Sequence, residues 1–296
     1  MVAQPALFKD LEPNQIVNVA QVSKYSPFRY PGGKTWLVPT IRKWLRTLNA
    51  PAAEFYEPFA GGGIISLTVA FEQLADHVTM VELDEEVAAV WKTIIAGDAD
   101  WLANRIVKFN LTQASLQRAL AKKTEAINEL AFKTILKNRT FHGGILATGS
   151  GVLKHGENGK GIHSRWYAQT LKKRILNIKT VRKRITFVQK DGLQVIKDNR
   201  ARKDAVWFID PPYTVRGNGK RAGRRLYTHY ELDHEELFRV MSKVSGVFLM
   251  TYDNDESVRE LARRYSFDFE PIAMKGTHHA EMKELLIGRD LRWARA

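Results

Sequence analysis

The tetrapeptide Asp210-Pro211-Pro212-Tyr213 places hydrogen-bond acceptors beside an aromatic ring. It directly follows the apolar run 205–209, which predicts a buried strand. The two prolines stiffen the loop and carry no N–H, so carbonyl oxygens are left to accept hydrogen bonds next to the Asp210 carboxylate. Acceptors beside a flat ring suit an exocyclic amine on a base that stacks on Tyr213. The alternative interpretation is a Pro-Pro turn without a function.

A second motif, Glu57-Pro58-Phe59-Ala60-Gly61-Gly62-Gly63, lies between a strand-like run and the helix-like run 64–70. Its glycines allow positive φ angles and a close approach of the backbone to a ligand. The motif matches neither the GxGxxG dinucleotide fingerprint nor a phosphate loop, so a plain tight turn explains it equally well by itself. The next strand, 78–81, ends on Glu82, a carboxylate placed to accept hydrogen bonds from ribose hydroxyls. Asp84 is a nearby alternative, and an ordinary surface carboxylate is the simpler interpretation of either residue.

Strands and helices alternate on both sides of a long helical segment. Further strands are predicted at 185–189, 205–209, 247–251, 267–274 and 285–287, with helices at 192–199, 234–242 and 255–265. This alternation predicts an α/β fold with a parallel, Rossmann-like sheet. Residues 100–137 have a helical pattern with Thr112 as an N-cap, 138–165 resemble a hairpin or long loop, and 167–183 form a basic helix. We therefore predict an N-terminal arm (1–23), a sheet-containing domain (24–100 and 185–296) and an inserted, mostly helical domain (101–184).

The positive charge of the chain is concentrated in that insert. The formal net charge is +14, yet residues 101–190 alone hold 19 Lys or Arg against 3 Asp or Glu. The rest of the chain is close to neutral, which favours binding of a polyanion over a merely solvated helix surface.

The composition excludes several classes of protein. There is no cysteine, which excludes a disulfide scaffold, a thiolate metal site and cytosine-C5 methylation through a cysteine nucleophile. No apolar stretch approaches the roughly 20 residues of a membrane span, and the first residues do not resemble a secretory signal. We expect an intracellular, cytoplasmic protein without a membrane contact.

A further motif lies upstream of the first strand: Phe28-Arg29-Tyr30-Pro31-Gly32-Gly33-Lys34. The order YPGGK, EPFAGGG, acidic strand end, basic insert and DPPY resembles the Dam-type (D12 class) adenine-N6 DNA methyltransferases over residues 24–290. That family usually reads WAGGK at the first motif and Asp at the acidic strand end, so Tyr30, Pro31 and Glu82 are departures that keep the chemical character.

The resemblance implies a cofactor, a partner and a set of site residues. The implied methyl donor is S-adenosyl-L-methionine, the implied partner is double-stranded DNA, bound by a monomer or by a dimer, and no metal is needed. The residues expected to line the donor site are Tyr30, Lys34, the loop with Phe59, Gly61 and Gly63, Glu82 and Asp210, with Asp191 beside the donor's adenine.

The family reads DNA with a module between the acidic strand and DPPY. The segment Lys137-Asn138-Arg139-Thr140-Phe141-His142-Gly143-Gly144 resembles the start of its recognition hairpin, so Lys137, Asn138 and Arg139 are predicted DNA contacts. The alternative for them is an ordinary helix C-terminus. The basic, glycine-rich loop 214–225 is predicted to meet phosphates through Arg216 and Arg221, or else to be a surface loop that never touches DNA.

Three rival functions stay open at this point. An N4-cytosine methyltransferase also methylates an exocyclic amine, but that group usually has Ser at the first position of the tetrapeptide. The others are an RNA methyltransferase and a catalytically silent DNA-binding protein on the same fold. The sequence does not give the recognition site, the oligomeric state, or the choice between a restriction–modification, phage or housekeeping role.

Overall fold

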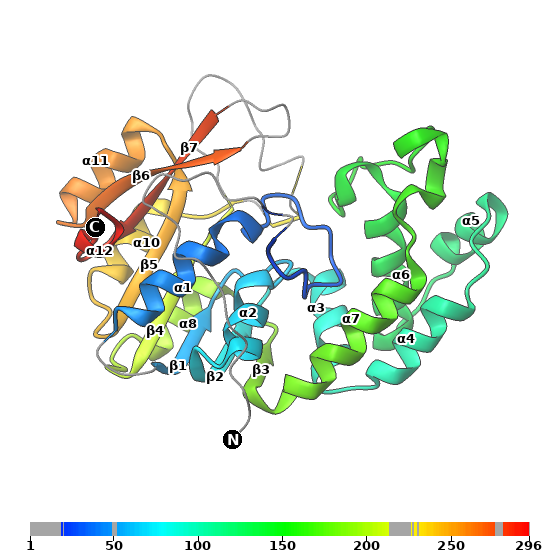
Figure 1. Cartoon of the computed structure of the whole chain (residues 1–296), viewed down its shortest axis with the longest axis horizontal. Coiled ribbons are helices and arrows are strands. Elements are labelled where there is room, and N and C mark those ends of the chain that lie inside the picture. The colour runs from blue at the N-terminus through cyan, green and yellow to red at the C-terminus, as the bar shows by residue number, and fades with distance from the viewer. Residues whose placement is uncertain are drawn as a thin grey trace.

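The structure is a computed structural model that describes residues 19, 21–48, 52–212, 226, 228, 229, 231–275 and 281–295. Its centre is one seven-stranded sheet (Figure 1). The strands are β1 (Ala52–Glu57), β2 (Ala75–Val81), β3 (Ile185–Val188), β4 (Ala205–Ile209), β5 (Val247–Asp253), β6 (Asp268–Lys275) and β7 (Glu281–Gly288). No helix among the described residues is long and apolar enough to cross a bilayer.

The order of the strands creates a natural ligand-binding edge. The order is β3-β2-β1-β4-β5-β7-β6, with the first five strands parallel and β7 antiparallel to both of its neighbours. The chain runs outward from β1 to β3 and then returns to start β4 directly beside β1. In open α/β sheets, ligands bind at the carboxyl ends of the strands at such a switch point. Glu57 ends β1 and Asp210 follows β4, so two predicted motifs meet there.

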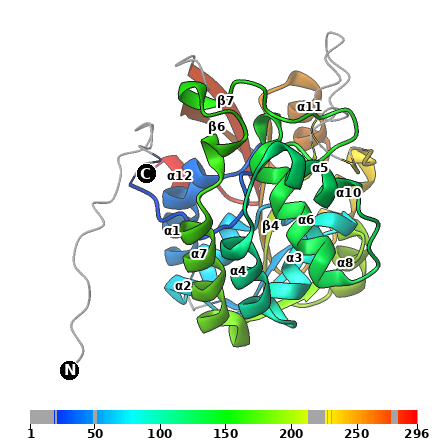
Figure 2. The same cartoon turned by 90° about the vertical axis from the view of Figure 1, so that its right-hand side faces the viewer.

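Helices cover both faces of this sheet (Figures 1 and 2). The described α-helices are α1 (Val38–Arg46), α2 (Ile64–Glu72), α3 (Glu85–Ile95), α4 (Ala99–Lys108), α5 (Gln113–Ala121), α6 (Ile127–Thr140), α7 (Ala168–Val181), α8 (Gly192–Asn199), α10 (His234–Met241), α11 (Glu256–Arg264) and α12 (Arg292–Arg295). Short 3₁₀ turns are η1 (Thr35–Leu37), η2 (His142–Gly144), η3 (Glu157–Gly159), η4 (Gly161–Arg165) and η5 (Arg182–Arg184).

Side-chain alternation along the buried strands divides the core into two layers. On β1, Phe55 joins one apolar cluster with α1, α2 and α3, and the next residue, Tyr56, joins another with α8, α10 and α11. β4 alternates in the same way, so Phe208 belongs to the first cluster and Trp207 to the second. This two-residue period of strands fixes which helices lie on which face. The predicted α/β, Rossmann-like fold class is confirmed.

The predicted helical segment is divided into shorter helices. The pattern over 100–137 breaks into α4, α5 and α6, and Thr112 caps α5 as predicted, forming a capping box with Ser115. α6 packs on α3 and α7 on α4, so the helical segment lies against one end of the sheet layer (Figure 2). Residues 141–153 form a turn structure closed by a bridge between Phe141 and Val152, which fits the predicted hairpin. The predicted arm at 1–23 lies mostly outside the described residues, and the domain boundaries stay a prediction.

Candidate active site

A cavity of about 710 Å³ lies at the switch point of the sheet. It is lined by Pro58–Gly63 after β1, by Asp210–Pro212 after β4 and by Glu82 after β2, together with the segment that contains Tyr30 and Lys34. Its size is that of a small-molecule or cofactor site. The two motifs that the sequence separates by about 150 residues therefore share one cavity, as the hypothesis of a joint site requires.

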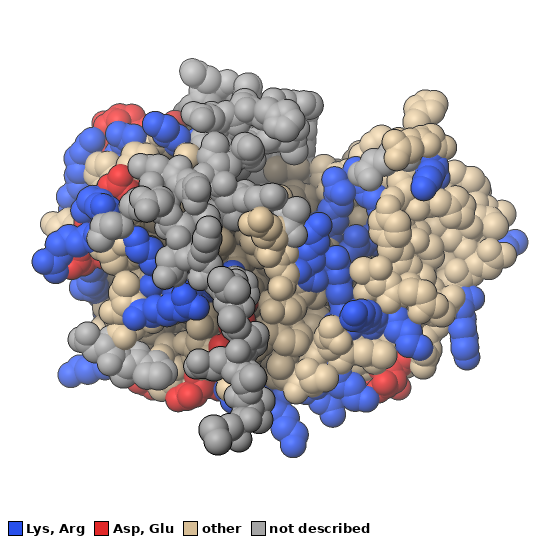
Figure 3. All heavy atoms as spheres, viewed as in Figure 1, with Lys and Arg blue, Asp and Glu red and all other residues tan. Residues whose placement is uncertain are grey.

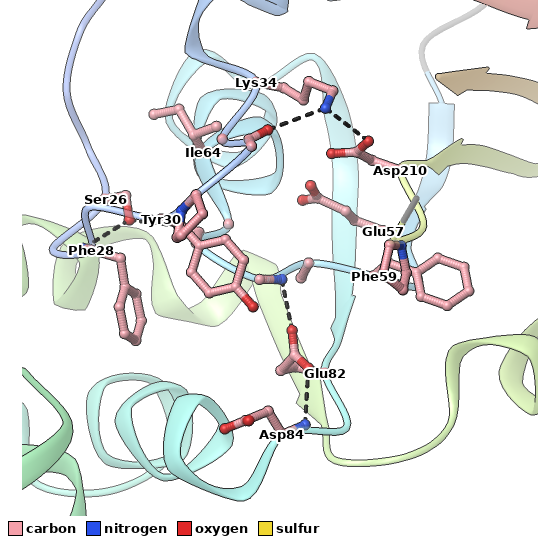
Figure 4. Close-up of a pocket in the computed structure, with 18 of the residues that line it drawn as sticks. Ser26, Phe28, Tyr30, Lys34, Glu57, Phe59, Ile64, Glu82, Asp84 and Asp210 are labelled. Atoms are coloured by element: carbon pink, nitrogen blue, oxygen red, sulfur yellow. Dashed lines mark hydrogen bonds and ion pairs between the residues drawn. The ribbon is translucent and has the colours of Figure 1, made fainter. Parts of the chain in front are cut away.

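The Asp210 carboxylate is held by two side chains from other elements. Lys34 Nζ lies 3.0 Å from Asp210 Oδ1, and the Thr251 hydroxyl at the end of β5 donates to the same oxygen at 2.9 Å. Lys34 is almost fully buried and also lies 3.5 Å from Glu284 Oε2 on β7. These contacts fix Asp210 in one orientation toward the cavity, where Figure 4 shows it beside Glu57.

Glu57 accepts a hydrogen bond from the first turn of α2, the helix that follows the glycine turn. The first turn of α2 has no side-chain N-cap, since its N-cap residue is Gly63, and Glu57 Oε2 accepts the backbone N–H of Ser66 at 2.8 Å instead. Burial raises the pKa of Glu57 to about 8, more than the hydrogen bonds from Ser66 lower it. Glu57 is therefore mostly protonated at neutral pH and can donate a hydrogen bond into the site.

The Glu82 carboxylate accepts hydrogen bonds from backbone N–H groups of two loops. Its Oε2 accepts from Gly61 at 2.8 Å, and its Oε1 accepts from Leu83 and Asp84 at 2.8 and 2.9 Å (Figure 4). Burial raises the pKa of Glu82 to about 7 despite these donors. Asp84 has a different task, because its carboxylate caps α3 by accepting from Val87. Of the two predicted acids, Glu82 is thus the one that ties the glycine turn to the end of β2.

The glycine turn is needed because an aromatic ring covers it. A Cβ atom on Gly61 would lie 2.6 Å from the Tyr30 ring, and one on Gly62 would lie 2.7 Å from Tyr30 Cβ. Gly61 and Gly63 also have positive φ angles of 46° and 63°. Trp91 holds the turn from below by donating its indole N–H to the Gly61 carbonyl at 2.9 Å. The ring and the turn are therefore in direct contact, and only a hydrogen atom fits between them at Gly61 and Gly62.

The remaining predicted donor-site residues also line the cavity. Phe59 lies on the side of Glu57 and Asp210, and Lys34 lies beside Asp210 (Figure 4). Asp191 follows β3 and caps α8 by accepting from Gln194 at 2.8 Å, with its side chain exposed at the rim. All eight residues predicted for the donor site line this cavity: Tyr30, Lys34, Phe59, Gly61, Gly63, Glu82, Asp191 and Asp210. Their contacts with a donor stay a prediction.

The chain matches one protein family over most of its length. The family model of the D12 class N6 adenine-specific DNA methyltransferases matches residues 30–275, from the Tyr30 motif through the tetrapeptide at 210. The chain belongs to this family. It is an enzyme that transfers a methyl group from S-adenosyl-L-methionine to N6 of adenine in DNA. The rival cytosine and silent DNA-binding functions are not favoured.

Solved structures that resemble this methyltransferase are distant. One is a putative RNA methyltransferase from Pyrococcus horikoshii, at 8% identity and a TM-score of 0.41, covering 91% of this chain and 92% of that one. Another is the rRNA methyltransferase aviRa from Streptomyces viridochromogenes, at 11% identity and a TM-score of 0.35, covering 92% and 90%. The putative methyltransferase yhhF from Escherichia coli has 11% identity and a TM-score of 0.35, with 86% of each chain covered. A search of curated proteins found no significant match.

The structure corrects one predicted DNA contact of the methyltransferase. Asn138 is fully buried, and its amide accepts from the backbone of Arg29 and donates to the carbonyls of Arg29 and Gly144, at 2.8 to 3.0 Å. It therefore pins the turn after α6 to the segment before Tyr30 and has no surface to offer DNA. The described contacts of Asn138 are thus internal, and the resemblance of this segment to a recognition hairpin stays a prediction.

The other predicted DNA contacts have different surroundings. Lys137 forms an ion pair with Glu86 and lines a second hollow of about 450 Å³ with residues 146–150. Arg139 lines the main cavity. The predicted DNA contacts Arg216 and Arg221 lie outside the described residues, and so does Tyr213, on which the base is predicted to stack. All of these stay predictions.

The wall of the cavity opposite the strand ends is basic. Arg139 and Arg174 line it, and they donate to the carbonyls of Pro27 and Ser26. Burial, together with the nearby positive charges of Arg174, Arg29 and Arg165, lowers the pKa of Arg139 to about 9. Neither Arg139 nor Arg174 pairs with a carboxylate in the described part of the chain, and the buried Nε of Arg139 has no hydrogen-bond partner there. Lys and Arg side chains follow the hollow between the two halves of the molecule (Figure 3).

Sequence reasoning missed three residues of this site. Thr251 and Glu284 reach Asp210 and Lys34 from β5 and β7, and Arg174 reaches the basic wall from α7. None of them belongs to a local motif. Thr251 had the best available signal, because it ends a predicted strand at the edge where the other motifs lie.

Proposed function

We propose that this methyltransferase acts on an adenine that is extruded from double-stranded DNA, and that Asp210 and the Pro211 carbonyl hold its amino group. The observation that supports this most directly is the position of Asp210, which follows β4 at the switch point and is oriented by Lys34 and Thr251. No hydrogen bond reaches the Pro211 carbonyl from the described residues, so it is available as an acceptor. Base extrusion is required because N6 of a paired adenine is inaccessible inside the duplex.

The catalytic contribution of the chain is positioning and electrostatics. S-adenosyl-L-methionine supplies the electrophilic methyl group when it is bound. Asp210 and Pro211 accept the two amino hydrogens, which orients the nitrogen lone pair and increases its electron density. Tyr213 is the predicted stacking surface for the base, and Pro212 keeps the loop stiff between the two. Asp210 can accept the N6 proton that the product must lose, with Lys34 stabilising the carboxylate until that point.

The residues around the glycine turn fit the methyl donor. The Glu82 carboxylate has the polarity to accept from ribose hydroxyls, and it is already oriented by three backbone N–H groups. Tyr30 and the glycine turn both line the cavity, and the proposal places the methionine portion of the donor beside them. Phe59 and Asp191 both line the cavity, and in the proposal they provide an apolar face and a polar edge for the donor's adenine ring.

The basic wall is proposed to bind DNA phosphates. Arg139 is buried and Arg174 is half-buried, neither has a carboxylate partner in the described residues, and a phosphodiester would supply an anionic partner. The excess of 16 positive charges in residues 101–190 supports the same partner. Lys137, and Arg216 and Arg221 of the loop after the tetrapeptide, are proposed as further contacts.

The test is product analysis on unmodified duplex DNA. The purified enzyme is incubated with methyl-labelled donor and with DNA that lacks methylation, and the digested nucleosides are separated. The proposal expects label in N6-methyladenosine only, and more label with duplex than with single-stranded DNA or RNA of the same sequence. Label in N4-methylcytosine, or a preference for RNA, would overturn it.

A further inference from the structure

We propose that Glu284 is a positioning residue of the methyltransferase reaction, which controls how strongly Lys34 holds Asp210. Glu284 lies on β7, beyond residue 275, where the family match ends. Its carboxylate is 3.5 Å from the Lys34 ammonium, which in turn lies 3.0 Å from Asp210. The inference rests on the proposed role of Asp210 as the acceptor for the target amine.

The three groups place one buried cation between two carboxylates, of which Glu284 is buried and Asp210 is partly exposed to the cavity. Lys34 is 3% exposed and Glu284 is 7% exposed, so water screens their interaction weakly. The antiparallel register places Asp253 of β5 directly opposite Glu284, while its neighbour across the other side of β7 is the apolar Ile272. In the described part of the chain, the charged groups that act on Glu284 are thus Lys34, Asp210 and Asp253.

The ionisation state of Glu284 determines how strongly the Lys34 ammonium interacts with the Asp210 carboxylate. When Glu284 is ionised, it competes with Asp210 for the ammonium, so Asp210 keeps more electron density for the N6 amine. When Glu284 is neutral, Lys34 pairs with Asp210 alone, and Asp210 becomes a weaker acceptor. Ionised Glu284 therefore favours methyl transfer.

This change of charge falls within the working range of pH. Burial raises the pKa of Glu284 to about 7, and the nearby Asp210 and Asp253 add to the effect while Lys34 opposes it. Glu284 is neutral below this pKa and ionised above it, so the rate should rise as the pH increases through neutrality. Other groups of the site titrate nearby, including Glu82, and they are common to the wild-type enzyme and its variants.

The experiment compares Glu284→Gln with the wild-type enzyme in single-turnover methyl transfer from about pH 6 to about pH 8.5, which isolates the chemical step from product release. Glutamine keeps the size and stays neutral. We expect the variant to be about ten-fold slower at the high end and to approach the wild-type rate at the low end, because both then carry a neutral group. The ratio of the two rates cancels the titrations that both enzymes share.

Two further measurements separate this effect from a fold defect. Calorimetric titration with S-adenosyl-L-methionine at the low end of the pH range should give the same affinity for both proteins, since Glu284 is then neutral in both and does not line the cavity. Glu270→Gln is the matched control, because Glu270 lies on β6 of the same hairpin but pairs with Arg295 at the surface. Its rate should equal the wild-type rate at every pH.

A rate ratio that is constant across the pH range would show a merely structural role and overturn the inference. An unchanged rate in Glu284→Gln would overturn it as well. Both outcomes leave the proposed function intact as long as Asp210→Ala is inactive, whereas an active Asp210→Ala variant would refute the role of Asp210 itself.

Discussion

The charged side chains on the two walls of the cavity differ in their partners within the protein. On the strand-end wall, Asp210 is bound by Lys34 and Thr251, and Glu82 by three backbone N–H groups. On the helical wall, Arg139 and Arg174 reach only backbone carbonyls among the described residues. The first wall is preorganised by the protein itself, whereas the second keeps positive charge for an anion from outside. The difference indicates that methyl transfer and DNA binding can be separated by mutation.

The largest expected effect comes from the strand-end wall. Asp210→Ala removes the oriented acceptor for the target amine, so methyl transfer should fall by roughly 100-fold or more. DNA affinity should change little, because the basic wall is intact. Labelled methyl incorporation and a gel-shift titration measure the two quantities. Asp204→Ala is the control, since Asp204 lies at the other end of β4 and pairs with Arg202 at the surface. Strong loss of DNA binding by Asp210→Ala would contradict the separation.

The helical wall should show the reverse pattern. Arg174→Met keeps most of the side-chain volume but removes one cation, so DNA affinity should fall by about ten-fold and the salt dependence of binding should weaken by about one charge. Affinity for S-adenosyl-L-methionine should stay constant. Lys173→Met, which removes an exposed charge from the neighbouring position of α7, provides the comparison. Equal losses of DNA affinity in both variants would mean that DNA binding depends on the total positive charge and not on the position of Arg174.

A third variant tests the donor side of the strand-end wall. Glu82→Gln should weaken S-adenosyl-L-methionine binding by roughly ten-fold, because a carboxylate that accepts hydroxyl hydrogen bonds is replaced by a neutral amide. The pKa of Glu82 is raised to about 7, so in the wild-type enzyme the affinity should rise with pH as Glu82 ionises, and this rise should be missing in the variant. Calorimetric titration at several pH values measures the donor affinity of both proteins. Asp76→Asn, at the start of β2 and far from its carboxyl end, should behave like the wild type.

The smallest expected effect concerns the packing contact between Tyr30 and the glycine turn. Gly62→Ala adds a methyl group 2.7 Å from Tyr30 Cβ, so the ring must shift and donor affinity should fall a few-fold, with a loss of about 1–2 kcal/mol in the free energy of unfolding. Gly151→Ala meets no atom within 4 Å and should change neither quantity. Thermal melting and calorimetry compare them. Unaltered donor binding in Gly62→Ala would show that the ring is not part of the donor site.

Local sequence patterns were sufficient for most strands and helices of the sheet-containing domain and for the order of the motifs, although α1 was not predicted. The strand at 205–209, the helix at 192–199 and the N-cap at Thr112 are where the sequence predicts them, because each depends on residues that are neighbours along the chain. The pattern over 100–137 was less informative. Its three helices share one periodicity, and the breaks between them depend on capping and on packing against α3.

The sequence by itself determined that Glu57, Glu82 and Asp210 stand at strand ends, since apolar runs and turn residues encode where strands stop. Only the tertiary structure decided which side chains complete the site. Asn138 is turned inward by a partner 109 positions away, and Glu284 reaches Lys34 only because β7 pairs with β5 in one register. Such partners are chosen by strand order and burial, which act between segments that have no pattern in common.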